Sequence, residues 1–94
     1  MTKQIRIGLI VLTAVIGAAF TSSAMAASKQ LCQSYARLAV QQATIMQAQN
    51  RGCVGFRWHH WYDGHYKWCR EVSAGSAAGE YQVRQNTILN NGPC

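Results

Sequence analysis

Four cysteines constrain the fold of this 94-residue chain more than any other feature. They are Cys32, Cys53, Cys69 and Cys94. In a short exported chain, an even number of cysteines is typical of a disulfide framework. A zinc module would need a close pair such as C-x2-C, and separations of 21, 16 and 25 residues provide none. The cysteines therefore predict two disulfides, provided that the chain leaves the cytoplasm.

The first 26 residues have the three parts of a secretory signal peptide. Two basic residues precede an uncharged apolar run at 7–20, and the Ala-Met-Ala tripeptide ending at Ala26 matches a cleavage site. An uncleaved membrane anchor is disfavoured, because about 14 apolar residues are fewer than the ~20 that span a bilayer. We expect a signal peptide at 1–26, a single disulfide-stabilised domain at 27–94, and a periplasmic or secreted protein without stable membrane insertion.

The expected mature chain of 68 residues has seven basic and three acidic side chains, a net charge of +4. The basic residues are dispersed and form no Lys/Arg-rich run, which argues against nucleic-acid binding. A mild attraction to anionic envelope polymers is the more modest inference. A chain of this length builds one domain with a small core, which disulfides commonly stabilise.

The segment 28–50 is the clearest helix, because its apolar residues recur at three- and four-residue steps. We expect one buried stripe formed by Cys32, Tyr35, Ala36, Ala39, Val40, Ala43 and Met46. Ser28 is a suitable N-cap, and Gly52 lies where a left-handed residue would end the helix. A second apolar row, at seven-residue spacing, consists of Leu31, Leu38 and Ile45. That row indicates either that the aromatic loop covers this side of the helix or that the helix forms a dimer interface. We expect the loop to cover it, and the protein to be a monomer.

A weaker helix is predicted at 76–91, after a Ser/Gly-containing connector at 73–76. Arg84 and Gln85 interrupt its apolar face. Glu80 can form a favourable i,i+4 ion pair with Arg84. The tetrapeptide Asn-Asn-Gly-Pro is a clear stop signal.

The segment 57–70 allows two structures. In the first, Asp63 caps a short helix, and in the second Asp63-Gly64 is the turn of a β-hairpin between aromatic-rich strands. The helix would place four residues on one face, His65, Trp68, Cys69 and Val72. We favour the helix, because each strand would need a cover for its buried face that so small a molecule lacks. The predicted fold is all-α, a small disulfide-stapled domain of two longer antiparallel helices, a short helix and an aromatic loop; the alternative is α+β with a hairpin at 57–70.

Four cysteines allow three pairings. If the first and last helices run antiparallel, Cys32 at the start of one lies near Cys94 after the end of the other. Cys53 then pairs with Cys69 and closes the aromatic stretch into a loop, which contributes ~3 kcal/mol in the chain-entropy model. We expect this nested pairing.

The stretch 52–70 contains all three tryptophans and all three histidines of the chain. Flat aromatic rings beside basic residues suit sugar rings or an acidic protein surface. The predicted contact residues are Arg57, Trp58, His59, Trp61, Tyr62 and Lys67. The stretch favours a non-catalytic binding or structural module of the bacterial cell envelope, whose partner is glycan, peptidoglycan or a protein.

The alternative is a periplasmic metal-binding or pH-responsive protein, because His59, His60 and His65 offer imidazole groups that bind metals and protons. Catalysis is disfavoured, since only three carboxylate side chains remain in the expected mature chain and no serine lies in a recognisable nucleophile motif. We expect no cofactor.

A frame of residues runs through nearly all of the expected mature chain: Cys32, Tyr35, Ala36, Ala39, Val40, Gln42, Gly52, Cys53, Trp58, His65, Trp68, Cys69, Glu80, Arg84, Leu89 and Cys94. This frame resembles a group of small exported, cysteine-containing proteins and domains of Gram-negative bacteria. The group has no settled activity, so the resemblance implies an architecture and no mechanism.

Overall fold

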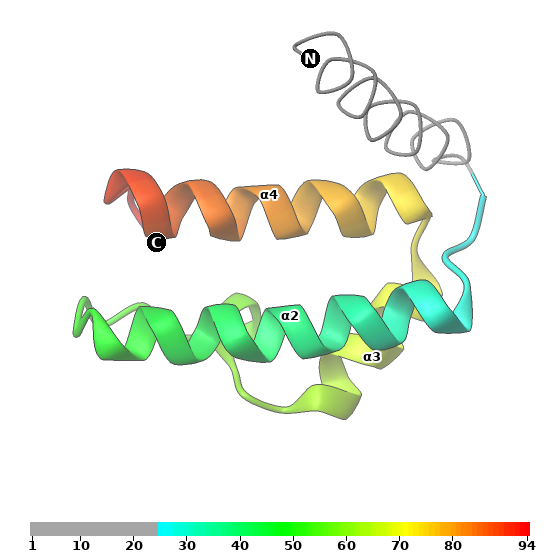
Figure 1. The fold of residues 1–94 in the computed structure, drawn as a ribbon, viewed down its shortest axis with the longest axis horizontal. Coiled ribbons are helices and arrows are strands. Elements are labelled where there is room, and N and C mark those ends of the chain that lie inside the picture. Colours follow the sequence, from blue (N-terminus) through cyan, green and yellow to red (C-terminus); the bar gives the residue numbers. More distant parts are fainter. Residues whose placement is uncertain (1–24) are drawn as a thin grey trace, which may run out of the picture.

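The computed structural model describes residues 25–94, which form three α-helices and one 3-10 turn (Figure 1). In chain order they are α2 (Lys29–Ala48), η1 (Phe56–Trp58), α3 (Tyr62–Glu71) and α4 (Ala74–Asn90). The described residues contain no strand, only an isolated β-bridge between Ala26 and Ser73. The predicted all-α, disulfide-stapled class is confirmed, and the alternative hairpin at 57–70 is wrong.

Helix α2 begins at the predicted cap and ends slightly early. Ser28 Oγ accepts a hydrogen bond from the Leu31 amide at 3.1 Å and so caps the helix, as predicted. The helix ends at Ala48, and Asn50 rather than Gly52 is the first left-handed residue, with φ 55°. Asparagine tolerates this conformation because its short polar side chain can hydrogen-bond locally.

Helix α3 starts one residue before the predicted cap. Trp61 is its N-cap, and Asp63 lies in the first turn, where a carboxylate interacts favourably with the helix dipole. The indole of Trp61 lies over this turn: a Cβ at Gly64 would come within 2.5 Å of Trp61 Cε3. Gly64 is therefore needed for close packing. His65 and Cys69 are buried on the predicted face.

Helix α4 starts two residues before its predicted beginning. Ser73 Oγ accepts from the Ser76 amide at 3.1 Å and caps a helix that begins at Ala74. The predicted connector at 73–76 is thus wrong, because a capping serine and a loop serine look alike in sequence. Asn91 takes the left-handed conformation, with φ 50°, and confirms the predicted stop.

Helices α2 and α4 lie side by side and run in the same direction (Figure 1). Gln42 Nε2 donates to the Tyr81 carbonyl at 3.2 Å and, further along both helices, Gln49 Nε2 donates to the Ile88 carbonyl at 3.3 Å. The predicted antiparallel arrangement is wrong. The loop after α2 and helix α3 together carry the chain back to the start of α2, so α4 sets out from the same end.

The parallel arrangement also decides the disulfides. Cys32 bonds to Cys69, with Cα atoms 5.5 Å apart, and Cys53 bonds to Cys94, with Cα atoms 5.4 Å apart. The two disulfides are confirmed, but the nested pairing of Cys32 with Cys94 and Cys53 with Cys69 is wrong. Because α2 and α4 end at the same side, the cysteines that follow them meet there.

The core is divided into two apolar clusters. One lies around Tyr35 at the start of α2, and the other joins Met46, Trp58 and Ile88 near the ends of α2 and α4. Between them, buried Gln42 on α2 faces buried Arg84 on α4, whose Nε donates to Gln42 Oε1 at 2.6 Å. The middle of the bundle is therefore a polar layer.

The second apolar row of α2 is exposed. Leu31 and Leu38 are each 38% exposed and Ile45 is 47% exposed, so the expected cover by the aromatic loop is wrong. The loop packs instead on the buried stripe of α2, where Trp58 contacts Met46.

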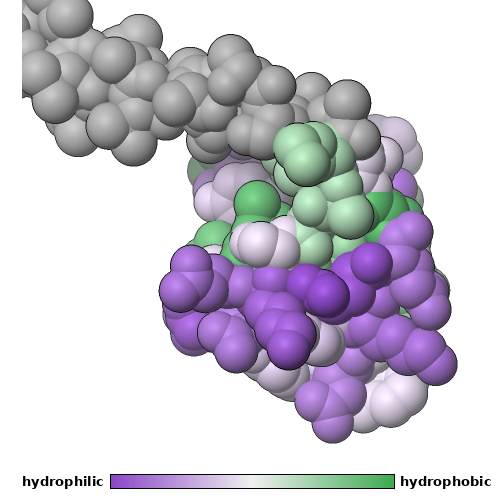
Figure 2. Space-filling model, turned by 90° about the vertical axis from the view of Figure 1, so that its right-hand side faces the viewer, coloured by the Kyte–Doolittle hydropathy of each residue, from purple (hydrophilic) through white to green (hydrophobic). Residues whose placement is uncertain are grey.

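Figure 2 shows the end of the molecule at which α2 and α4 begin. Hydrophilic residues cover the lower half of this view.

The segment before α2 packs against the junction of α3 and α4. Ala27 is 2% exposed, and the Ala74 amide donates to the Met25 carbonyl at 2.8 Å. The predicted signal peptide at 1–26 lies outside the described residues except for its last two. Within 25–94, no helix combines the length and apolar character that a membrane crossing requires.

Candidate functional site

A cleft of about 390 Å³ opens between the aromatic loop with α3 on one side and α4 on the other. The elements η1, α3 and α4 each pack on α2, and residues from all four elements line the cleft. Its aromatic lining consists of Tyr35, Phe56, Trp58 and Trp68. Its charged lining consists of Arg57, Glu80 and Arg84, and we call the whole the charged cleft.

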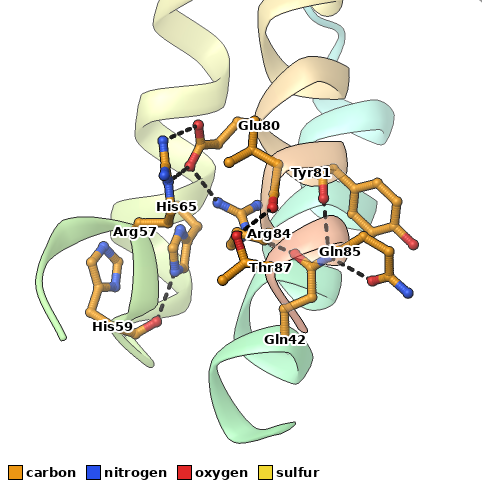
Figure 3. Close-up of polar contacts among 10 residues, drawn as sticks. Gln42, Arg57, His59, His65, Glu80, Tyr81, Arg84, Gln85 and Thr87 are labelled. Atoms are coloured by element: carbon orange, nitrogen blue, oxygen red, sulfur yellow. Dashed lines mark hydrogen bonds and ion pairs between the residues drawn. The ribbon is translucent and has the colours of Figure 1, made fainter. Parts of the chain in front are cut away.

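An ion-pair network crosses the charged cleft (Figure 3). Arg57 donates to both carboxylate oxygens of Glu80, from Nε at 2.5 Å and from Nη2 at 3.2 Å. Arg84 Nη1 donates to the same carboxylate at 3.4 Å. Because the Glu80 carboxylate accepts from two guanidinium groups, it holds both arginines in place.

Gln42 fixes the other side of Arg84. Its Nε2 donates to the Tyr81 carbonyl and to Gln85 Oε1, the latter at 3.0 Å. These two bonds turn the amide oxygen of Gln42 toward Arg84 (Figure 3). The guanidinium of Arg84 also lies over the Tyr35 ring, 5.0 Å from its centroid. Arg84 is thus fixed by α2, by the rest of α4 and by an aromatic face.

Two donors on the lining have no hydrogen-bond partner among the described residues. Arg84 is 1% exposed, and its Nη2 is unpartnered. Trp58 is 4% exposed, and its Nε1 is also unpartnered. Buried donors normally have partners, because an unpaired one loses its hydration without compensation. The charged cleft therefore has hydrogen-bonding capacity that the protein itself does not use.

The charges of the cleft do not cancel. Arg57 and Arg84 supply two positive charges and Glu80 one negative charge, which leaves one positive charge beside aromatic walls. Burial raises the pKa of the Tyr35 hydroxyl, an effect that the neighbouring Arg84 partly opposes, so the phenol stays neutral. An anion entering the cleft would be attracted by this net positive charge.

His65 lies on the lining of the charged cleft, whereas His59 and His60 do not. His65 is 2% exposed, its Nε2–H donates to the His59 carbonyl at 2.8 Å, and the two rings stack with centroids 3.9 Å apart. Burial lowers the pKa of His65 to about 4 and also lowers the pKa of His59. Within 25–94 no three His, Cys, Asp or Glu side chains converge as metal ligands. His65 is thus a packed side chain, on the helix face predicted for it.

The predicted contact residues do not form one surface. Arg57 and Trp58 line the charged cleft, but Trp58 is buried, which corrects its expected exposure. Trp58 is covered because η1 turns its indole onto Met46 and Ile88. Trp61 is 64% exposed. The other predicted residues lie off the cleft: half-buried His59, and exposed Tyr62 and Lys67.

The α2 and α4 residues of the cleft were not predicted as site residues. Arg84 was expected only as an ion-pair partner of Glu80, and Gln42 was named only in the frame of residues that resembles the exported group. A signal existed, because both residues fall within otherwise apolar helix faces: Gln42 lies seven residues after Tyr35. Two polar residues on facing stripes indicate a buried pair.

All four cysteines are in disulfides, so the described chain offers no free thiol to the cleft. The two bonds are typical of a protein that folds outside the cytoplasm. The cleft's own chemistry is recognition by hydrogen bonds, charge and aromatic contact. Comparison with protein-family models, curated proteins and solved structures found no match to this chain.

Proposed function

We propose that the chain is a non-catalytic binding module of the bacterial cell envelope, and that it binds its ligand in the charged cleft. The observation that carries the proposal is the cleft itself, about 390 Å³ lined by four aromatic side chains and three charged ones. Binding sites for small ligands combine apolar walls with a few placed polar groups, and this lining has both. Envelope glycan is the partner class, because sugar rings stack on aromatic faces while their polar groups bind side chains such as Arg57.

The location of the cleft supports a binding role over a purely structural one. Phe56 is 61% exposed at the cleft, whereas Trp58 is buried deeper in the lining. A ligand ring could therefore rest on an exposed aromatic side chain and still reach fixed polar groups. The Cys53–Cys94 disulfide holds the loop to the end of α4, and Cys94 lines the cleft. A stapled cleft needs little ordering when it binds.

Tryptophan fluorescence tests the proposal. Trp58 and Trp68 line the cleft, and Trp61 does not. In a Trp61→Phe variant, all remaining tryptophan emission comes from the cleft. We expect soluble peptidoglycan fragments to shift this emission in a saturable way.

The matched control is Phe56→Ala, which removes the exposed ring of the cleft and leaves both emitting tryptophans in place. It should weaken the response of the Trp61→Phe protein several-fold. No shift with any envelope glycan fraction, or a shift that only Trp61 reports, would refute binding in the cleft.

A pH-responsive role is the second candidate, and one observation favours it. His65 is buried against His59 with its pKa lowered to about 4, so acid would charge a packed side chain. The test is ligand binding at pH 7.5 and 5: unchanged affinity and unchanged stability would exclude this role.

A further inference from the structure

The proposed function does not specify which chemical group of a ligand the charged cleft prefers. The lining residues indicate one such group. The unpartnered Nη2 of Arg84 is the first indication, because this guanidinium is 1% exposed and yet incompletely paired. A buried charge of this kind costs free energy unless a second charge or acceptor meets it. An acceptor-only, negatively charged group on a ligand would satisfy it.

A second donor lies on the same lining. Trp58 Nε1 can only donate a hydrogen bond, and it has no partner among the described residues. The lining thus offers two unpaired donors, and both oxygens of Glu80 already accept from arginine. A hydroxyl or amide would need acceptors as well as donors, whereas a carboxylate needs donors alone.

The charge balance indicates how many negative charges the ligand carries. Arg57, Arg84 and Glu80 together leave one positive charge. A monoanion neutralises it, whereas a doubly charged phosphate would place an excess negative charge beside the Glu80 carboxylate. The balance therefore favours a carboxylate over phosphate.

The aromatic lining indicates what carries the carboxylate. Tyr35, Phe56, Trp58 and Trp68 surround the charged group, and the Tyr35 ring already lies under the Arg84 guanidinium. Flat apolar faces of this kind contact sugar rings or aromatic side chains. A small, fully hydrated anion such as acetate would leave these faces unused.

We propose that the charged cleft binds a monocarboxylate carried on a ring-shaped body, with Arg84 and Trp58 donating to the carboxylate and the aromatic lining contacting the ring. This inference rests on the proposed binding function and names its ligand class. A sugar acid of an envelope polymer and the carboxyl terminus of a peptide both present this chemistry.

Titration calorimetry with the disulfide-intact protein tests the inference and separates the two sources. The sugar arm compares glucuronate with glucuronamide, and the peptide arm compares N-acetylphenylalanine with its amide. The acid of at least one arm should bind about tenfold or more tightly than its neutral amide, as expected for a hydrogen-bonded charge. The arm that binds identifies the source, and inorganic phosphate should bind more weakly than that acid.

Two substitutions connect the binding to the named donors. Trp58→Phe keeps a buried aromatic ring and removes only the indole N–H, so it should reduce the affinity for the acid about tenfold and leave the amide unaffected. Glu80→Gln removes the competing negative charge, so it should tighten acid binding. Trp61→Phe is the matched control for the tryptophan, because Trp61 lies off the cleft, and it should change neither affinity.

Failures of the two proposals are distinguishable. If acids and amides bind equally well, or if peptidoglycan fragments bind and no carboxylate probe does, the carboxylate inference is overturned and the binding function stands. If Trp58→Phe folds and binds the acid like the unaltered protein, the assignment of the donor is wrong. If neither glycan fragments nor carboxylates bind, both proposals fail.

Discussion

Acid should destabilise this domain, mainly through His65. The ordinary pKa of histidine is 6.5, and burial lowers that of His65 to about 4 in the folded protein. Above pH 6.5 the imidazole is neutral in both states and has no effect on stability. As the pH falls below 6.5, the unfolded chain binds a proton that the folded chain does not, so the free energy of unfolding falls.

The magnitude follows from the two pKa values. Between pH 8 and pH 5 the loss is about 2 kcal/mol, and it levels off at about 3 kcal/mol once the pH is below 4. The pKa of His59 is lowered in the same direction, again mainly by burial, and adds to the loss. Small domains have stabilities of only ~5 kcal/mol, so this effect is a large part of the total.

The assay is urea unfolding of the disulfide-intact protein at pH 8, 7, 6 and 5, at constant ionic strength, followed by circular dichroism. His65→Gln keeps an N–H that can donate to the His59 carbonyl and cannot titrate, so it should lose about 2 kcal/mol less than the unaltered protein between pH 8 and 5. His60→Gln, at an exposed position, is the matched control and should keep the full loss. An equal loss in the His65→Gln variant would refute the assignment, whatever that variant's stability at pH 8.

Two further predictions concern the disulfides and the glycines. Replacing Cys32 and Cys69 by alanine should lower the free energy of unfolding by about 4 kcal/mol, because the disulfide closes a loop with a sequence separation of 37. The domain would then be close to unfolding in water. A loss below about 1 kcal/mol would contradict this prediction. Gly64→Ala should cost about 1 kcal/mol or more and alter Trp61 emission, because the new methyl would lie 2.5 Å from the indole. Gly79→Ala is its matched control, because no atom lies within 4 Å of a Cβ added at Gly79. This change should raise the free energy of unfolding by about 0.5–1 kcal/mol, measured by thermal unfolding. Equal effects of the two substitutions would contradict this prediction.

Local signals in the sequence predicted the helices well. The caps Ser28 and Asn91 and the buried face of α3 each depend on residues within four positions along the chain. The choice of helix over hairpin at 57–70 was also right, but it depended on the lack of a cover for two strands and not on a local signal. Asp63 proved to be a first-turn residue and not the cap. The 3-10 turn η1 was not foreseen, because three residues are too short to show a periodicity.

The cleft could be predicted only in part. Two of the six predicted contact residues, Arg57 and Trp58, lie on its lining. Its other polar residues, Glu80 and Arg84, come from α4, and the Arg57–Glu80 pair joins positions 23 apart in sequence. A charged residue within an apolar stripe only weakens the prediction of a buried helix face, unless the residue that pairs with it is known.

The sequence by itself determined the number of disulfides, the helical class and the burial of His65, because these follow from composition and from spacing within one or two turns. Only the tertiary structure decided the direction of α4, the bonds Cys32–Cys69 and Cys53–Cys94, and the position of Arg84 between two apolar clusters. Those features depend on the path by which the loop after α2 returns the chain. The path of the chain between α2 and α4 is set by packing between residues distant in sequence, and a local sequence pattern cannot predict such packing.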